Sequence, residues 1–496
     1  MLFPCKHVPF KMAMTNPLAS AFVIILIIFP EITALVTSPA PGSTASTAIE
    51  SGPDDTVRAD PLNNFKRYRG GFNVTNKHYW SSVIFTGACG YAIGLLCLVC
   101  GLLYASFVGT TKLCCKADAR RKTKSRCACD DFWFILLAIL LTILAAAATG
   151  IVLAGSSKFY SEARASVNII IRTANEASQT LYNTTGALKD VQSKLEGSSV
   201  GDQAFHVLTS TTHKLDAESA LVEMQASKNR HRIHRGLKIA FIITTVTISF
   251  NSVAAASLSV CGVLRSRRAL YFLIVLCWLM TVMCWLLFGV YFFLDKFSKD
   301  ACTAFAKFEE NPYNSSLSSI LPCGRLLSAK TVLYDVSAGI YNFVNQVNAN
   351  ISLQRGSTVH VCNPFSAPPQ YSYQPENCPA NTVPIADIPK VLRIFMFSKA
   401  ELTSVYDRVE AYTSSIQDLL NVYPSMENLV ECQPLKQAFS EILVQHCKPL
   451  QNFAKITWGG LVFLAVLMLF LVLSCAMSPK PPSKTAATGT SSTHSP

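Results

Sequence analysis

The sequence predicts an all-α integral membrane protein with five transmembrane helices and two extracellular helical coiled segments, the second of them disulfide-braced. Half of the 496 residues are hydrophobic and only 15% are charged, whereas soluble domains carry about a quarter charged residues. The apolar residues also gather in long uncharged stretches instead of being spread along the chain. Together these observations exclude an ordinary soluble enzyme and a disordered chain.

The chain is expected to begin with a signal peptide, residues 1–34. Its apolar stretch, 18–29, follows two lysines and ends at Pro30, and it is shorter than the roughly 20 residues that a spanning helix needs. A charged start, a short apolar middle and small residues near Ala34 are typical of a secretory signal cleaved at that point. An uncleaved anchor is the alternative. Residues 35–78 then form an extracellular N-terminal arm.

Five longer stretches contain no Lys, Arg, Asp or Glu, and each can cross a bilayer as a helix whose backbone hydrogen bonds are internal. They are residues 79–111, 132–157, 239–264, 269–294 and 456–477. The third is the least apolar because it carries several Thr and Ser residues and Asn251. Such residues usually hydrogen-bond to neighbouring helices.

The signal places the mature N-terminus outside, so five spans leave the C-terminus in the cytosol. The positive-inside rule agrees, because the predicted cytosolic loops 112–131 and 265–268 and the disordered tail 478–496 carry most of the net charge of +13. Their location explains the charge without nucleic acid. One basic cluster at the outer end of the third span disagrees, and it could snorkel to headgroups or pair with acidic outer helices. It comprises Lys228, Arg230, Arg232, Arg235 and Lys238, with His231 and His234.

Six cysteines lie in the predicted outer segment 295–455, where three disulfides are expected because that compartment permits oxidation. They are Cys302, Cys323, Cys362, Cys378, Cys432 and Cys447. Fifteen pairings are possible, and proximity alone favours Cys432 with Cys447 and Cys302 with Cys323. A zinc site is the alternative, but no Cys-x-x-Cys spacing supports it.

The first cytosolic loop combines cysteines with basic residues next to the membrane. Its cysteines are Cys114, Cys115, Cys127 and Cys129. They are candidates for S-palmitoylation, and a four-thiolate metal site or unmodified thiols are the alternatives. Its basic residues are expected to contact anionic inner-leaflet lipid, at about 1 kcal/mol each: Lys112, Lys116, Arg120, Arg121, Lys122, Lys124 and Arg126. A topology signal alone would also explain them.

Four sequons mark candidate N-glycosylation sites in segments assigned outside. They are Asn73, Asn183, Asn314 and Asn350. Asn73 is the weakest candidate because it lies close to the first span.

The outer segments show helical periodicity. Residues 158–238 carry apolar stripes on both sides of a Gly-Ser-rich turn, which predicts an antiparallel helical hairpin. Further stripes, 333–347 and 388–423, predict two packed helices, the longer of which Pro424 is expected to end. The proline-rich loop between them is bracketed by Cys362 and Cys378, which predicts a disulfide-tied loop.

The string DPLNNFKRYRGGFNVTNKHYWSSVIFTG, residues 60–87, resembles the entry to the first span in a family of plant pentaspan transmembrane proteins. The layout of the whole chain also resembles that of prominin and, more distantly, of tweety proteins. The prominin likeness includes the Cys-rich first cytosolic loop. It implies a role in membrane protrusions and sterol-rich domains, and the tweety likeness implies an anion channel.

Catalytic motifs are missing from the sequence. Ser199 lies in a G-S-S-V-G string that matches the nucleophile-elbow pattern, but that motif needs a strand before it, and here it joins two predicted helices. No ionisable residue lies within the five spans, whereas proton-coupled carriers and pumps need one. The small-residue pair Gly90 and Gly94 predicts close helix packing, within the chain or in a homo-oligomer. We therefore expect no enzyme activity and no cofactor.

The sequence thus favours a non-enzymatic protein that organises membrane lipid or shape, in the plasma membrane or a secretory-pathway endomembrane. Its expected partners are membrane lipids, anionic in the inner leaflet or sterol, and not nucleic acid. One alternative is a channel or lipid-transport protein in which the polar face around Asn251 lines a path. Another is a receptor or adhesion module that acts through its extracellular helices.

Overall fold

The computed structural model describes residues 57–114, 128–195, 202–264, 267–313, 315–318, 321, 323–353, 360–390 and 403–477. Within these ranges five helices are long and apolar enough to cross a membrane, which agrees with the number of spans predicted from the sequence. Their apolar stretches lie in α3 (Ala88–Cys114), α4 (Ala128–Leu195), α5 (Asp202–Leu264), α6 (Arg267–Glu310) and α11 (Lys448–Met477). The predicted signal peptide and C-terminal tail lie outside the described residues.

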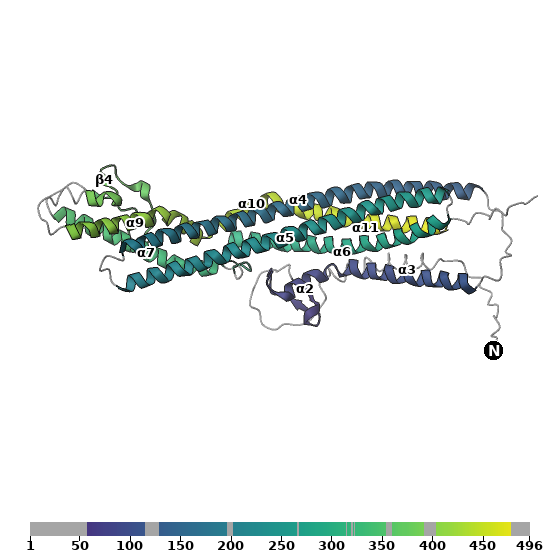
Figure 1. Cartoon of the computed structure of the whole chain (residues 1–496), viewed down its shortest axis with the longest axis horizontal. Helices are drawn as coiled ribbons and strands as arrows, with labels where there is room; N and C mark the ends of the chain where they lie inside the picture. The colour runs from purple at the N-terminus through teal and green to yellow at the C-terminus, as the bar shows by residue number, and fades with distance from the viewer. Residues whose placement is uncertain are drawn as a thin grey trace, which may run out of the picture.

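The two longest helices, α4 and α5, run side by side along an elongated bundle (Figure 1). They contain 68 and 63 residues, which at 1.5 Å per residue gives each a length of about 100 Å. That is about three times the thickness of a bilayer's hydrocarbon core. On α4, buried positions recur at helical spacing from Ala138 to Val191. One packing face therefore continues past the end of the apolar stretch, which explains why the helix does not break there.

We call the part of the bundle formed by the five apolar stretches the apolar half, and the remainder the polar half. Helix α11 is the centre of the apolar half, because Leu461, Leu464, Met468 and Leu471 are fully buried and the helix packs against α4 and α6. Helix α3 lies beside the bundle and packs against α6 (Figure 1).

Residues 58–85 form a small folded unit, here called the cap, where the sequence led us to expect an arm followed by a spanning helix. It consists of β1 (Arg58–Asp60), a 3₁₀ turn, the antiparallel strand β2 (Lys66–Tyr68) and α2 (Lys77–Phe85). Tyr68, Phe72 and Tyr79 form its buried aromatic core. The first predicted span is therefore two helices, because the chain breaks at Thr86 and Gly87 before α3 begins.

In the polar half, α7 (Cys323–Leu353) and α9 (Thr403–Val430) pack together and enclose a separate apolar cluster. The predicted stripes are packing faces where they are described, since Leu333, Ile340 and Tyr423 are buried in that cluster. Residues 391–402 of the second stripe lie outside the described residues. Pro424 does not end the second helix as predicted, because α9 continues to Val430 with the proline inside it. An interior proline costs about 3 kcal/mol, and burial of Tyr423 and Val430 on either side offsets that cost.

Candidate functional site

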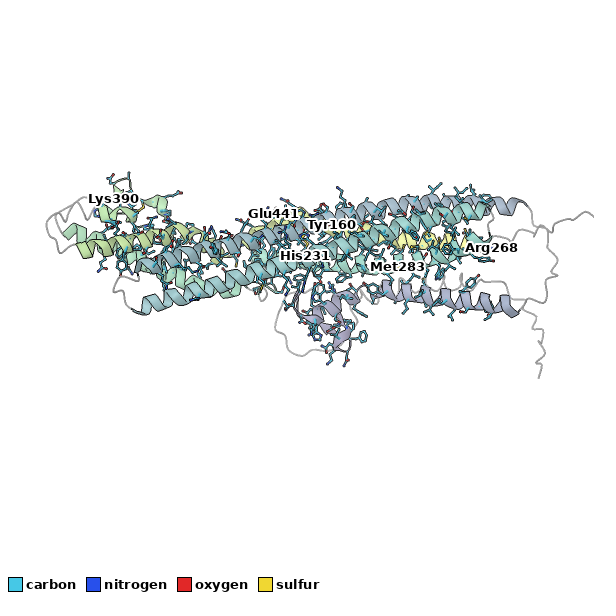
Figure 2. The ribbon with its side chains drawn as sticks, viewed as in Figure 1. Tyr160, His231, Arg268, Met283, Lys390 and Glu441 are labelled. Carbon is cyan, nitrogen blue, oxygen red and sulfur yellow. A yellow bond between two sulfur atoms is a disulfide. The ribbon has the colours of Figure 1, made fainter. Side chains whose placement is uncertain are left out.

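A basic cavity of about 910 Å³ lies between α4 and α5. Figure 2 places two of its lining residues, Tyr160 and His231, near the middle of the long axis, with Arg268 towards one end and Lys390 towards the other. Five lining side chains are arginine or lysine, against a single carboxylate, that of Glu176. The five are Arg164 and Arg172 on α4, and Arg230, Arg235 and Lys238 on α5.

The cavity begins at the boundary between the apolar and polar halves and extends into the polar half, where Arg172 lies about 22 Å beyond the apolar stretch of α4 at 1.5 Å per residue. Lys238 directly precedes the apolar stretch of α5, and Arg164 lies about 10 Å beyond that of α4 at 1.5 Å per residue. On the apolar side, the ring of Tyr160 stacks on that of Phe241, with centroids 4.9 Å apart. Aromatic rings of this kind gather where hydrocarbon meets the headgroup layer. The end of the cavity next to Lys238 and Tyr160 thus adjoins the apolar stretches of α4 and α5.

Within the described part of the chain, one of the five cationic side chains in the cavity is paired with a carboxylate. Arg172 donates a hydrogen bond to Glu441 over 3.1 Å and lies 3.8 Å from Glu176. Among the side chains that the structure describes, no carboxylate lies within 4 Å of Arg164, Arg230, Arg235 or Lys238. Arg235 instead donates to Nε2 of His231 over 2.6 Å. Four cationic side chains therefore share one cavity without an ion pair to any described carboxylate.

A disulfide joins α6 to the chain just before α11. It links Cys302 to Cys447, so the pairings expected from proximity, Cys302 with Cys323 and Cys432 with Cys447, are wrong. The error arose because the two cysteines are 145 residues apart and meet only when α6 and α11 pack. Next to the bond, Nδ1 of His446 lies 2.7 Å from a carboxylate oxygen of Glu162 on α4. The segment that leads into α11 is therefore joined to both α6 and α4.

A buried polar network joins the cap to α6. Asp300 accepts hydrogen bonds from Arg58 at 2.7 and 2.5 Å and from the Tyr79 hydroxyl at 3.2 Å. Within the cap, Asp60 is 1% exposed and lies 2.6 Å from Nδ1 of His78. Burial alone would raise the pKa of Asp60, but hydrogen bonds from Ser81, His78 and the Leu62 amide outweigh it and lower that pKa.

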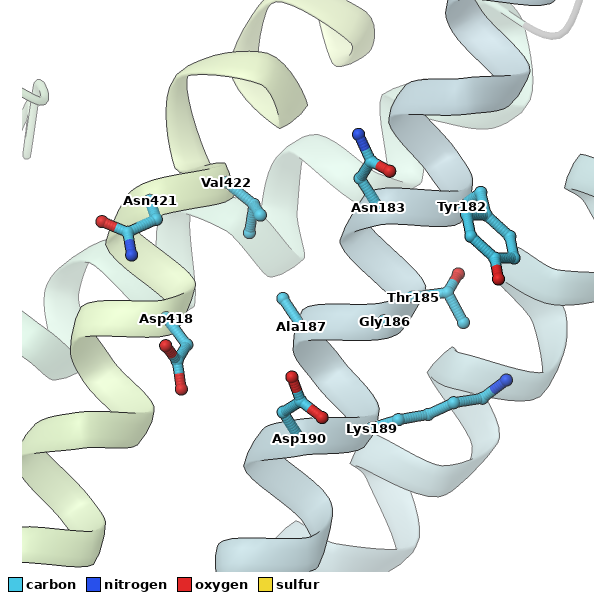
Figure 3. Close-up of a pocket in the computed structure, with 10 residues that line it drawn as sticks. All are labelled: Tyr182, Asn183, Thr185, Gly186, Ala187, Lys189, Asp190, Asp418, Asn421 and Val422. Atoms are coloured by element: carbon cyan, nitrogen blue, oxygen red, sulfur yellow. The ribbon is translucent and has the colours of Figure 1, made fainter.

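A second cavity, of about 460 Å³, lies between α4 and α9. Asp190 and Asp418 face each other across it, while Lys189 points away (Figure 3). No cluster of three or more potential metal ligands occurs among the described residues. The predicted sequon residue Asn183 lines this cavity and is exposed, whereas Thr185 of the same sequon is 1% exposed.

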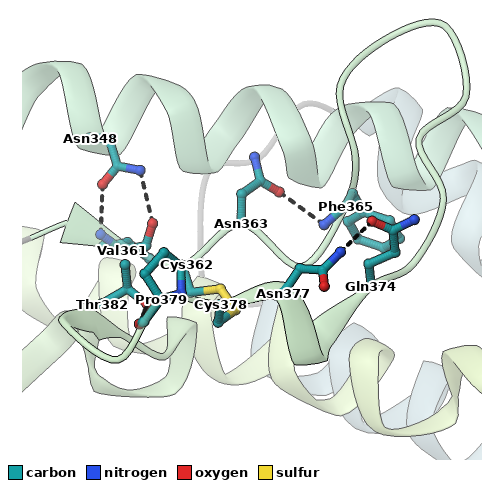
Figure 4. The surroundings of a disulfide bond; sticks show 10 residues. All are labelled: Asn348, Val361, Cys362, Asn363, Phe365, Gln374, Asn377, Cys378, Pro379 and Thr382. Carbon is teal, nitrogen blue, oxygen red and sulfur yellow. Dashed lines mark hydrogen bonds between the residues drawn. A yellow bond between two sulfur atoms is a disulfide. The ribbon is translucent and has the colours of Figure 1, made fainter.

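The proline-rich loop between α7 and α9 is closed by a disulfide between Cys362 and Cys378, as predicted (Figure 4). The carboxamide of Asn348 on α7 binds both backbone groups of Val361, accepting at 2.7 Å and donating at 2.9 Å. The loop also contains the parallel strand pair β3 (His360–Val361) and β4 (Thr382–Val383). This small unit is fastened to the end of the polar half.

Several predicted site residues fall where the structure gives no side chain. Most of the basic cysteine loop, with Cys115, Cys127 and six of its seven basic residues, lies outside the described residues. The backbone, but not the side chain, is described for Lys112, Cys114, Cys129, Cys323 and Asn350.

Two further sequon residues stand differently. Asn314 is outside the described residues, whereas Asn73 accepts two hydrogen bonds from Thr75 of its own sequon. Cys432 is disulfide-bonded. Palmitoylation, glycosylation and inner-leaflet contact therefore remain predictions.

The glycines of α3 are used inside the molecule. A Cβ on Gly90 would lie 2.6 Å from the backbone nitrogen of Gly289 on α6, and one on Gly87 would lie 2.5 Å from the Gly289 carbonyl oxygen. Gly94 faces the side chains of Trp285 and Leu286 on α6. A homo-oligomer through Gly90 and Gly94 remains a prediction.

Asn251, which the sequence suggested as part of a path, lies on α5 and is 0% exposed. Neither atom of its carboxamide has a hydrogen-bond partner among the atoms that the structure describes. It lines neither of the two cavities described above.

The sequence pattern indicates only the α5 half of the basic cavity, as a cluster of basic residues. On α4, Arg164, Asn168, Arg172 and Glu176 line the cavity and follow one another at four-residue steps. This spacing is a polar stripe along one helix face, and it could have been recognised beside the apolar stripe. Comparison with protein-family models and with curated proteins finds no match, so the class of protein rests on the fold alone.

Proposed function

We propose that this protein is a non-enzymatic, five-span membrane protein that organises membrane lipid or membrane shape. In this proposal the polar half stands outside the cell or in the lumen as a disulfide-braced stalk. The palmitoylated basic loop holds anionic lipid at the opposite, cytosolic face. The likeness of its layout to that of prominin supports the same role.

The observation that carries the proposal is the continuity of three helices across the boundary between the two halves. Helices α4, α5 and α6 each extend from the apolar into the polar half without interruption. A continuous helix resists bending, so a tilt of the stalk also tilts the spans and acts on the surrounding lipid. The Cys302–Cys447 disulfide and the Arg58–Asp300 pair further tie α6 to its neighbours.

Membrane tubes pulled from giant vesicles that contain the purified full chain test this proposal. We expect the protein to be enriched on tubes relative to the flat membrane. Inserting Gly-Ser-Gly-Ser after Ser157 should abolish the enrichment, because it uncouples the stalk from a span. The same insertion between residues 196 and 201, beyond the end of α4, is the matched control and should leave it unchanged. Equal density of the native chain on tubes and flat membrane would refute the role.

A conduction path is the second candidate, and Asn251 is the observation that favours it. A buried carboxamide without a partner is costly in an apolar interior, and passing water or ions would satisfy it. If the protein conducts, Asn251→Leu should abolish ion flux in liposomes. If it does not conduct, the same substitution should leave the vesicles equally tight and stabilise the bundle.

A further inference from the structure

We propose that the basic cavity between α4 and α5 binds the anionic, phosphate-bearing headgroup of a membrane lipid. This inference rests on the proposed lipid-organising function and adds a lipid class and a binding site to it. The site lies at the opposite end of the spans from the cytosolic basic loop, so it is a separate lipid contact.

The unmatched charge of the cavity points to an anionic ligand. Arg164, Arg230 and Lys238 have no ion pair among the described side chains, although like charges that lie close together repel one another. Such a grouping is unfavourable in the free protein and becomes favourable when an anion enters. Arg172, by contrast, is already neutralised by Glu441 and Glu176.

The kinds of donor in the cavity fit a phosphate better than an isolated carboxylate. Guanidinium groups bind phosphate oxygens through two parallel hydrogen bonds, and Lys238 adds a point charge. The carboxamides of Asn168 and Asn175 also line the cavity, and they match the hydroxyl groups of a sugar or inositol attached to the phosphate. A volume of about 910 Å³ exceeds what bare phosphate needs and lies within the range of small-molecule sites.

The apolar side of the cavity explains why the ligand is a lipid. At the boundary between the apolar and polar halves, the cavity is lined by Tyr160, whose ring stacks on Phe241. A ligand that lies across this boundary therefore places its phosphate among the cations and the start of its acyl chains against the bundle.

Binding of a fluorescent short-chain phosphatidylinositol to the purified full chain in non-ionic micelles tests the inference. The double variant Arg164→Gln/Lys238→Gln should weaken binding at least about tenfold, because two charge-assisted contacts are lost. The matched control is Lys228→Gln/Arg232→Gln, which removes the same charge from exposed positions on α5 that do not line the cavity. It should change the affinity less than twofold.

Three results would overturn the inference. They are equal weakening by the lining and control variants, equal affinity for short-chain phosphatidylcholine, and displacement of the probe by inorganic phosphate as effectively as by unlabelled phosphatidylinositol. The last result would identify free phosphate as the ligand. If the double variant does not fold, Arg230→Gln and Arg235→Gln should each weaken binding about threefold, and no effect of either would also overturn it. Lipid binding is measured in micelles, which contain no membrane tubes. The headgroup-binding inference can therefore be refuted while enrichment on tubes still supports the proposed function, or the reverse.

Discussion

The guanidinium of Arg58 forms two hydrogen bonds with the carboxylate of Asp300, at 2.7 and 2.5 Å, although 242 residues separate them. Asp300 is 3% exposed and also accepts a hydrogen bond from Tyr79. The pair joins the cap to α6 just beyond the apolar half. On the same side, the ring of Trp80 stacks on that of Phe297. The cap is therefore a fixed part of the bundle, and its attachment depends on a buried ion pair.

Arg58→Ala should release the cap. Removing one partner leaves the Asp300 carboxylate buried without its counter-charge, which typically costs about 3–5 kcal/mol. Hydrogen exchange of the α2 amides in the purified full chain should rise by at least about a hundredfold. Arg67→Ala, which removes an exposed arginine from β2 of the same cap, should leave the exchange unchanged. Protection of α2 that survives Arg58→Ala would show that apolar contacts alone hold the cap.

Acid should loosen the cap through Asp60. Because the pKa of this carboxyl is lower in the folded protein than its usual value of 3.8, its ionised form stabilises the fold above that value. The stabilisation is lost as pH falls below 3.8 through the folded-state pKa. Pepsin digestion between pH 2 and 5 should therefore cut the cap increasingly below pH 3.8, and in Asp60→Asn the cap should be cut over the whole range. A native cap that resists pepsin equally at pH 2 and pH 5 would contradict this assignment.

Gly90→Val should separate α3 from α6. The added side chain would meet the backbone of Gly289, and overpacking of this kind costs about 1–3 kcal/mol. The midpoint of thermal unfolding in detergent should fall by several degrees. Gly150→Val is the control, because a Cβ there meets nothing within 4 Å. Equal destabilisation by both would attribute the effect to helix propensity and not to the α3–α6 contact.

The sequence predicts well those features that repeat along the chain. Uncharged stretches predict the apolar helices, and the stripe through Leu333 and Ile340 predicts a packing face, because burial of one helix face imposes a regular pattern. The Cys362–Cys378 bond was also predictable, since the two cysteines are only 16 positions apart in the loop between two expected helices.

Features that depend on distant residues could not be predicted in this way. The cap rests on strands of three residues and on the Arg58–Asp300 pair, neither of which produces a periodic signal. The Cys302–Cys447 bond and the α4 side of the basic cavity likewise arise only when helices far apart in the chain pack together. Pro424 lies inside α9 although proline locally disfavours a helix interior, because its neighbours Tyr423 and Val430 are buried in the packed structure.

The central claim is that the apolar helices cross the membrane and leave the Cys302–Cys447 bond on the oxidising side. Intact cells that express the protein can be treated with a membrane-impermeant maleimide, before and after an impermeant reductant is applied from outside. We expect Cys302 and Cys447 to be labelled only after reduction, and from the outside. If both thiols stay unlabelled in intact cells after reduction, and are labelled without a reductant once the plasma membrane is permeabilised, the topology and with it the proposed stalk would be contradicted.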